Sequence, residues 1–62
     1  KTPSAFLNDL RISRARSLLQ HTTYTLDVIA SQCGYENGFY LSRVFTHHIG
    51  MAPSVYRSMH RV

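Results

Sequence analysis

The chain has 62 residues, of which 44% are hydrophobic and 16% charged, with seven Lys and Arg against three Asp and Glu. A chain of this length forms one small domain or part of one, and it buries only about 60% of the surface that its unfolded form exposes. These values exclude a multi-domain enzyme and an acidic disordered tail. The formal net charge is +4, and all the basic residues except Lys1 are Arg, whose planar guanidinium suits phosphate. A polyanionic partner is therefore expected.

Cys33 is the single cysteine, so the chain cannot form an internal disulfide. Small domains of oxidising compartments usually carry several disulfides, and we therefore predict a reducing, cytoplasmic location. The apolar runs are too short for a membrane span or a signal-peptide core. No membrane partner and no cofactor are expected.

Residues 3–20 are predicted to form a long amphipathic helix. Pro3 suits the first helical position and Thr2 its cap, and apolar residues recur at three- and four-residue steps. This stripe, which we expect to face the core, consists of Phe6, Leu7, Leu10, Ala15, Leu18 and Leu19. The opposite face carries Arg11, Arg14 and Arg16. A solvated helix surface is the first interpretation of these arginines, and contact with phosphate is the second.

A second helix is predicted to follow Thr25, which is a good N-cap, with Asp27 favourably placed in the first turn. Gly34 can supply the left-handed residue that ends this helix. Its apolar positions are Leu26, Ile29, Ala30 and Cys33. Because Cys33 then faces the core, we interpret it as a small buried hydrophobe and not as a reactive thiol.

A third helix is predicted after a short turn, capped by Asn37, running from about Gly38 to Ile49 and closed by Gly50. The side expected to be buried holds Leu41, Val44, Phe45, His48 and Ile49. The opposite side holds Phe39, Arg43, Thr46 and His47, flanked by Tyr40 and Ser42. An exposed Phe beside an Arg tends to mark a contact surface.

Pro53 suits the first position of a short last helix over residues 53–60, with Val55, Tyr56 and Met59 as its apolar stripe. No strand pattern or repeat is present. The expected fold is all-α, a small homeodomain-like bundle of about four helices that contains a helix-turn-helix.

A helix-turn-helix places its second helix in the major groove, where Arg can pair with guanine and an apolar side chain can pack on a thymine methyl group. Phe39, Tyr40 and Arg43 suit this role because they lie in the first two turns of the third helix. The amides near Asn37 can add a phosphate contact. In the alternative interpretation, Phe39 folds back on a neighbouring tyrosine and Arg43 is a solvated charge. The residues alone leave both interpretations open.

Three different sequence motifs follow one another along the chain. They are Arg11-Ile12-x-x-Ala15-x-x-x-Leu19, Leu26-x-x-Ile29-Ala30-x-x-x-Gly34-Tyr35, and Leu41-x-x-x-Phe45-x-x-x-x-Gly50-x-x-Pro53-x-x-Tyr56-Arg57. Together they resemble the C-terminal signature of the AraC/XylS family of bacterial transcription regulators. The resemblance implies a DNA-binding unit of two helix-turn-helix motifs joined by a long helix. Residues 3–20 resemble the linking helix, and residues 25–49 resemble the second motif. A first motif and an effector-binding domain are expected in the full-length protein.

The resemblance implies a transcription factor, such as an activator, that binds double-stranded promoter or operator DNA, with RNA polymerase as a further partner. By position, the base-contacting residues are Phe39, Tyr40 and Arg43. The backbone or flanking contacts are Asn37, Gly38, Thr46, His47 and Arg14. Gly38 and Phe39 stand where polar residues are common in the family, which favours thymine-methyl packing and an A·T-richer target. His47 and His48 stand where Lys or Arg is frequent, so modest affinity for the DNA backbone is expected.

Other functions find less support in the residues. The acidic residues Asp9, Asp27 and Glu36 are scattered, and the His and Cys positions show no metal-ligand spacing, so neither an enzyme nor a metal site is expected. The alternative function is a protein–protein interaction module that uses Phe39 and Tyr40 as anchors.

Overall fold

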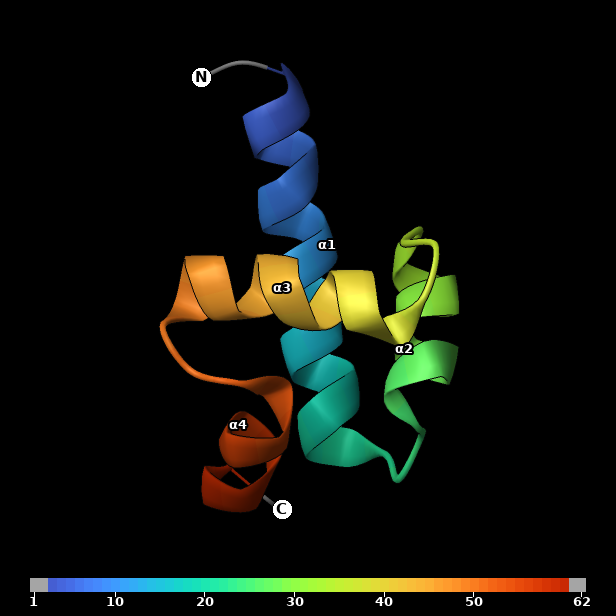
Figure 1. The fold of residues 1–62 in the computed structure, drawn as a ribbon, viewed down its shortest axis with the longest axis vertical. Helices are drawn as coiled ribbons and strands as arrows, with labels where there is room; N and C mark the ends of the chain where they lie inside the picture. Colours follow the sequence, from blue (N-terminus) through green and yellow to red (C-terminus); the bar gives the residue numbers. More distant parts are fainter. Residues whose placement is uncertain (1–2, 61–62) are drawn as a thin grey trace.

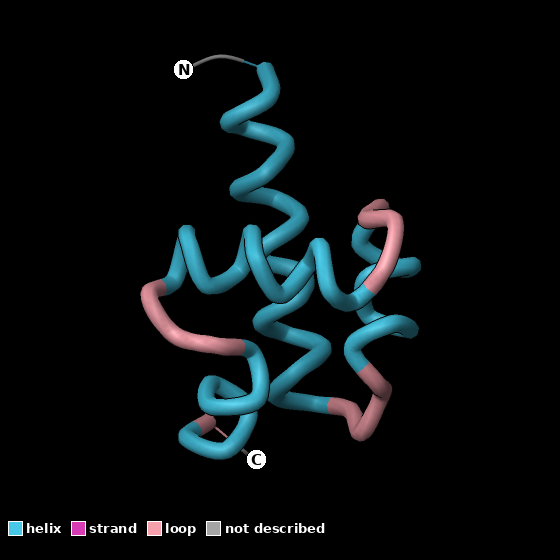
Figure 2. Tube along the Cα trace, in the orientation of Figure 1, coloured by secondary structure: helices cyan, strands magenta, loops and turns pink. Residues whose placement is uncertain are grey.

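The computed structural model describes residues 3–60 and forms four helices, with no strand among those residues (Figures 1 and 2). The helices are α1 (Pro3–His21), α2 (Leu26–Cys33), α3 (Gly38–Ile49) and α4 (Pro53–Met59). The predicted all-α fold is confirmed. The predicted ends of the first and last helices differ from the observed ends by one residue each, and the predicted cap Thr2 lies outside the described residues.

The helices enclose a core beneath α3, which crosses in front of α1 while α2 and α4 lie on either side (Figure 1). α1 packs against α2 and α4, and α3 packs against the same two helices. The centre of the core is Phe45, which is 0% exposed and meets the ring of Tyr56 edge-to-face at 5.4 Å between centroids. The buried hydrophobic residues are Ile12, Ala15, Leu19, Ile29, Ala30, Cys33, Tyr35, Leu41, Phe45 and Tyr56.

The ends of α2 and α3 follow the predicted capping residues. The Thr25 hydroxyl accepts a hydrogen bond from the Val28 amide at 3.3 Å, and the Asn37 side chain accepts one from the Tyr40 amide at 2.8 Å. Gly34 ends α2 in the left-handed conformation with φ of +88°, which glycine adopts without steric cost. These local signals fix the length of both helices and the tight turn between them.

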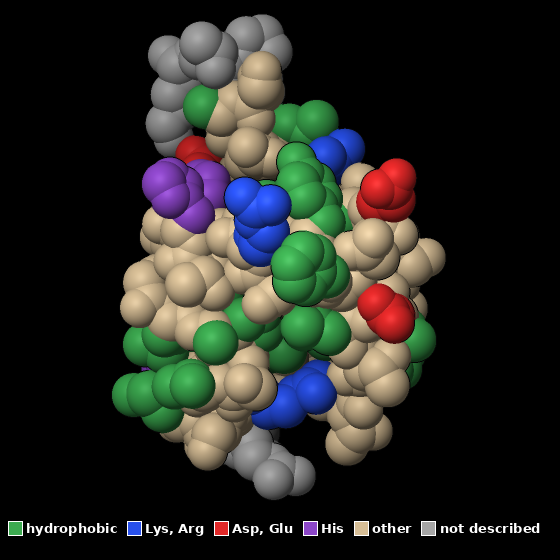
Figure 3. Space-filling view, in the orientation of Figure 1, with side chains coloured by type: hydrophobic (Ala, Val, Ile, Leu, Met, Phe, Trp, Pro, Cys, Tyr) green, Lys and Arg blue, Asp and Glu red, His purple; other side chains and the backbone are tan. Residues whose placement is uncertain are grey.

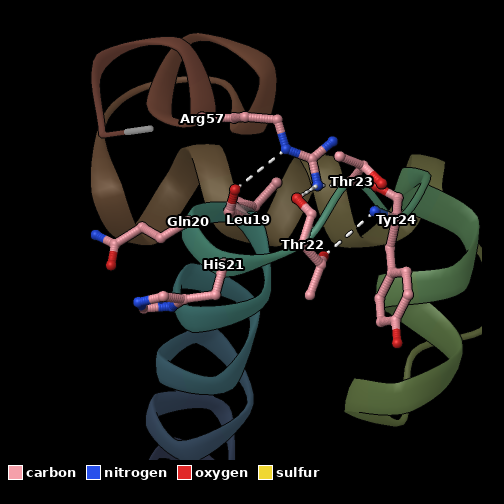
Figure 4. Close-up of a pocket in the computed structure, with 7 residues that line it drawn as sticks. All are labelled: Leu19, Gln20, His21, Thr22, Thr23, Tyr24 and Arg57. Carbon is pink, nitrogen blue, oxygen red and sulfur yellow. Dashed lines mark hydrogen bonds between the residues drawn. The ribbon is translucent and has the colours of Figure 1, made fainter. Parts of the chain in front are cut away.

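α4 is tied to the rest of the fold by Arg57. Its Nε donates to the Leu19 carbonyl at 3.2 Å, and its Nη2 donates to the carbonyls of Thr22 and Tyr24 at 3.2 and 2.8 Å (Figure 4). Ala52 provides no side-chain cap for α4. The Arg57 bonds instead attach the helix to the end of α1 and to the loop that follows it. One of the arginines that suggested a polyanionic partner is therefore part of the scaffold.

The prediction that Phe6, Leu7 and Leu10 face the core is wrong, since all three side chains are exposed. The reason is visible in the arrangement of the helices: the first turns of α1 extend beyond α2, α3 and α4, so no described element covers them (Figure 1). The periodicity of a helix shows which side is apolar but not whether a neighbour lies against it.

Val55 and Met59 of the apolar stripe of α4 are exposed, because this helix of seven residues buries only Pro53 and Tyr56. The prediction that His48 lies on the buried side of α3 is wrong. His48 lies at the edge of the buried side of α3 and is exposed, with its Nδ1 3.9 Å from Oδ1 of Asp9 on α1. At that position α3 already faces the gap beside α1 and not the core.

The predicted burial of Cys33 is confirmed. Burial raises the pKa of the thiol above its ordinary value of about 9.0, although the charges of Arg14 and Arg11 act in the opposite direction. Because the unfolded chain then loses this proton at a lower pH than the folded chain, the free energy of unfolding should fall as pH rises above about 9. The loss should end once pH exceeds the folded pKa.

Urea unfolding in steps from neutral pH to pH 10 measures this effect, which should be weaker in Cys33→Ala. A decline of equal size in the variant would assign the effect to other groups. Tyr35, whose pKa burial also raises, contributes only above its ordinary value of about 10.

Candidate nucleic-acid interface

The exposed face of α3 is where the sequence placed it. Phe39 is 76% exposed and Tyr40 is 50% exposed, and Arg43 is exposed one turn further along the helix. Thr46 and His47 continue the exposed face toward the end of α3. Figure 3 shows hydrophobic and basic side chains side by side on this face, over α3. The outward orientation of Phe39 and Arg43 is therefore confirmed.

Of the two aromatic side chains at the start of α3, one packs against a buried ring and the other does not. Tyr40 rests edge-to-face on the buried ring of Tyr35, with 5.6 Å between ring centroids, whereas Phe39 projects into solvent. The alternative in which Phe39 folds back on a tyrosine is thus excluded. Beside Tyr40 is an open hollow of about 410 Å³ between α1 and α3, lined by Asn8, Tyr40, Arg43, Val44, His47 and His48.

The backbone at the start of α3 is largely occupied by contacts within the chain. The Gly38 amide donates to Asp27 Oδ1 at 2.7 Å, and the Asn37 side chain caps the Tyr40 amide. Gly38 is itself buried, and a Cβ there would lie 2.8 Å from Asp27 Oδ1 and 3.0 Å from the Asp27 nitrogen. Gly38 thus allows α3 to approach α2. Among the first three amides of α3, only that of Phe39 has no hydrogen-bond partner within residues 3–60.

The other residues that were predicted to contact the DNA backbone do not all lie beside the exposed face of α3. Arg14 is exposed on α1 and does not line the hollow beside Tyr40 and Arg43. The Thr46 hydroxyl donates to the Ser42 carbonyl within α3 at 2.7 Å. The Asp27–Gly38 contact was missed by the sequence analysis, although an acidic residue early in α2 and a glycine at the start of α3 are its two local signs.

Within residues 3–60, no three His, Cys, Asp or Glu side chains lie close enough together to hold one metal ion. Nor is any helix there both long enough and apolar enough to cross a membrane.

Two capped helices, a tight turn and an outward-facing second helix define a helix-turn-helix domain. A family model described as a helix-turn-helix domain matches residues 1–59. The chain belongs to the AraC/XylS family of transcription regulators, of which it forms a C-terminal DNA-binding region.

Similar proteins agree with this assignment. The transcriptional activator RhaR of Klebsiella pneumoniae is 45% identical over 97% of this chain, which spans 21% of that protein. An AraC-type regulator from Chromobacterium violaceum has a TM-score of 0.93 at 32% identity over 97% of this chain and 54% of its own. The DNA-binding domain of AdpA, solved with a target DNA, has a TM-score of 0.88 at 29% identity over 95% of this chain and 53% of its own. The chain thus spans about a fifth of the RhaR relative and about half of these two structures.

Proposed function

We propose that this chain binds double-stranded operator DNA by placing α3 in the major groove, with Phe39, Tyr40 and Arg43 against the base edges. The observation that carries the proposal is the exposure of Phe39, at 76%, on a helix whose opposite side buries Leu41 and Phe45 completely. An exposed aromatic ring beside a guanidinium is costly in water and well matched to the floor of a groove.

Each side chain has a definite chemical role in this arrangement. The guanidinium of Arg43 can donate two hydrogen bonds to O6 and N7 of one guanine. The side chain of Phe39 has no polar atom, so it can recognise only a thymine methyl group or a similar apolar edge of a base. Tyr40 is held by Tyr35 and can add a hydrogen bond from its hydroxyl. We therefore expect a site with one guanine beside A·T pairs.

Backbone contacts complete the proposed interface. His47 and Thr46 continue the exposed face toward one phosphate strand, while the Phe39 amide and Asn37 lie at the start of α3, where a phosphate is favoured. Arg14 is proposed to contact the DNA backbone further from α3. With imidazoles in place of Lys or Arg at His47 and His48, the number of phosphates neutralised is small and the affinity of this chain alone is modest.

The proposal extends to the protein as a whole. Residues 3–21 act as a linking helix, and the exposed Phe6, Leu7 and Leu10 are where a first helix-turn-helix motif packs. Two linked motifs gain affinity through effective concentration. We further propose that the full-length protein carries an effector-binding domain and acts as an activator that contacts RNA polymerase. We also propose that it is located in the cytoplasm and has no catalytic activity.

Selection of bound sites from random duplex DNA tests the function directly, and Arg43→Ala tests the contact. The variant should weaken binding to the selected duplex by about 1–3 kcal/mol and relax the preference at one guanine position. Arg16→Ala is the matched control, because it removes the same charge from an exposed position on α1. An unchanged base preference in Arg43→Ala would remove Arg43 from the reading residues.

Salt separates this function from a protein-interaction module anchored by Phe39 and Tyr40. If binding neutralises roughly three phosphates, the logarithm of the affinity should fall with the logarithm of the salt concentration at a slope of about −2.7. An aromatic protein contact should scarcely respond to salt, since apolar burial carries no counterion release.

A further inference from the structure

Arg11 on α1 is held in an unusual environment for a basic side chain. Its guanidinium carbon lies over the buried ring of Tyr35, 5.4 Å from the ring centroid. The edge of the guanidinium lies against Gly34, where Nε and Nη2 are 3.3 Å from the position that a Cβ would occupy. Because glycine lacks that atom, the planar group fits between the turn and the ring. The contact with the ring and the close fit against Gly34 restrict the positions that the guanidinium can take.

The guanidinium of Arg11 makes no hydrogen bond to any residue that the structure describes. None of the hydrogen bonds or ion pairs among residues 3–60 involves Arg11. The contrast with Arg57 is direct, since Arg57 donates to three backbone carbonyls of the scaffold. A half-buried guanidinium has five donors in a rigid fork, a geometry that matches the oxygens of a phosphate.

Arg11 is connected to the exposed face of α3 through Tyr35. The ring of Tyr35 that supports Arg11 also supports Tyr40, so one platform holds a proposed base contact and a guanidinium. Asn8, one helical turn before Arg11 on α1, lines the hollow shared with Tyr40 and Arg43. Figure 3 shows basic side chains on both sides of the hydrophobic atoms over this face.

We propose that Arg11 binds a DNA backbone phosphate at the edge of the major groove, beside the bases that Tyr40 contacts. This inference rests on the proposed function and adds to it a residue that the sequence analysis interpreted first as a solvated charge. The buried Tyr35 hydroxyl has no hydrogen-bond partner in the described residues. The role of Tyr35 is then that of an aromatic platform that positions Arg11 on one side and Tyr40 on the other.

The test compares Arg11→Met with wild type on the selected duplex and on a mixed-sequence duplex over a range of salt concentrations. Met keeps the apolar stem against Tyr35 and removes the charge. Loss of one phosphate contact should reduce the size of the salt slope by about 0.9 on both duplexes. At about 0.1 M salt this corresponds to affinity that is roughly five- to tenfold weaker. The base preference should not change, because phosphates carry no sequence information.

Arg16→Met is the matched control, since Arg16 is an exposed arginine of α1 that lines a neighbouring hollow with Asp9 and His48. Its salt slope should equal that of wild type. If Arg11→Met also keeps the wild-type slope, Arg11 touches no phosphate and the inference is overturned, while binding by wild type leaves the proposed function standing. If wild type binds neither duplex, the proposed function fails and the inference with it.

A purely structural role for Arg11, such as support of the turn at Gly34, would weaken binding without changing the slope, and this outcome also overturns the inference. If Arg11→Met does not give a folded helical spectrum, nuclear magnetic resonance of wild type decides. Addition of the duplex should then shift the Arg11 Nε–Hε signal and leave that of Arg16 in place. An unmoved Arg11 signal contradicts phosphate binding.

Discussion

Phe45→Ala should remove a large part of the protein's stability. Phe45 is 0% exposed and packs edge-to-face on Tyr56, so its truncation should cost about 3–5 kcal/mol through lost burial and an unfilled cavity. At about 0.05–0.15 kcal/mol per residue, a chain of 62 residues has a total stability of only roughly 3–9 kcal/mol. Urea titration followed by circular dichroism measures the change.

Phe39→Ala is the matched variant on the same helix, six residues earlier. Because Phe39 is 76% exposed, its removal should change the free energy of unfolding by no more than about 0.5 kcal/mol. Binding to the selected duplex should nevertheless fall, with the largest loss at sites that carry a thymine under α3. A large loss of stability in Phe39→Ala, or binding equal to that of wild type, would contradict the outward role of this side chain.

Gly38→Ala should be the second most damaging change. The added Cβ would lie 2.8 Å from Asp27 Oδ1 and 3.0 Å from the Asp27 backbone nitrogen. The Asp27 side chain must then turn away, which breaks the 2.7 Å bond from the Gly38 amide, and the backbones of α2 and α3 must separate slightly. Overpacking and an unsatisfied buried amide together cost about 2–5 kcal/mol. Since α3 is the proposed reading helix, DNA affinity should fall with stability.

A double-mutant cycle with Asp27→Ala identifies the cause. Removing the carboxylate relieves part of the steric conflict and takes away the same hydrogen bond, so the double variant should be more stable than the sum of the two single changes predicts. Strict additivity of the two changes in unfolding free energy would show that the conflict lies elsewhere. Gly50→Ala serves as a control for glycine removal, because no atom lies within 4 Å of its Cβ position and only its left-handed φ of +89° opposes alanine.

Much of the fold could be predicted because its determinants are local. Thr25, Gly34 and Asn37 each act on backbone groups within a few residues, and the spacing of apolar residues in α2 and α3 repeats with the helical period. The exposed side of α3 followed from the same period, which is why Phe39 and Arg43 were placed correctly.

The remaining features depend on contacts between residues distant in sequence. The exposure of Phe6 and Leu10 depends on the absence of a covering element in residues 3–60, which no local pattern reports. The bonds of Arg57 reach 33 to 38 residues back along the chain. The position of Arg11 depends on a missing Cβ at Gly34 and on a ring one residue further, so its spacing on α1 could not distinguish it from a solvated arginine.

The anchoring of α4 by Arg57 has a mechanical consequence. It joins the last turn of α1 and the loop before α2 into one stiff body, so α1 behaves as a rod of about 28 Å for its 19 residues. A tilt of this rod by about 10° displaces one end by roughly 5 Å relative to the other. That exceeds the spacing of about 3.4 Å between successive base pairs. We therefore expect that an element bound to the projecting turns of α1 would determine which base pairs lie under α3.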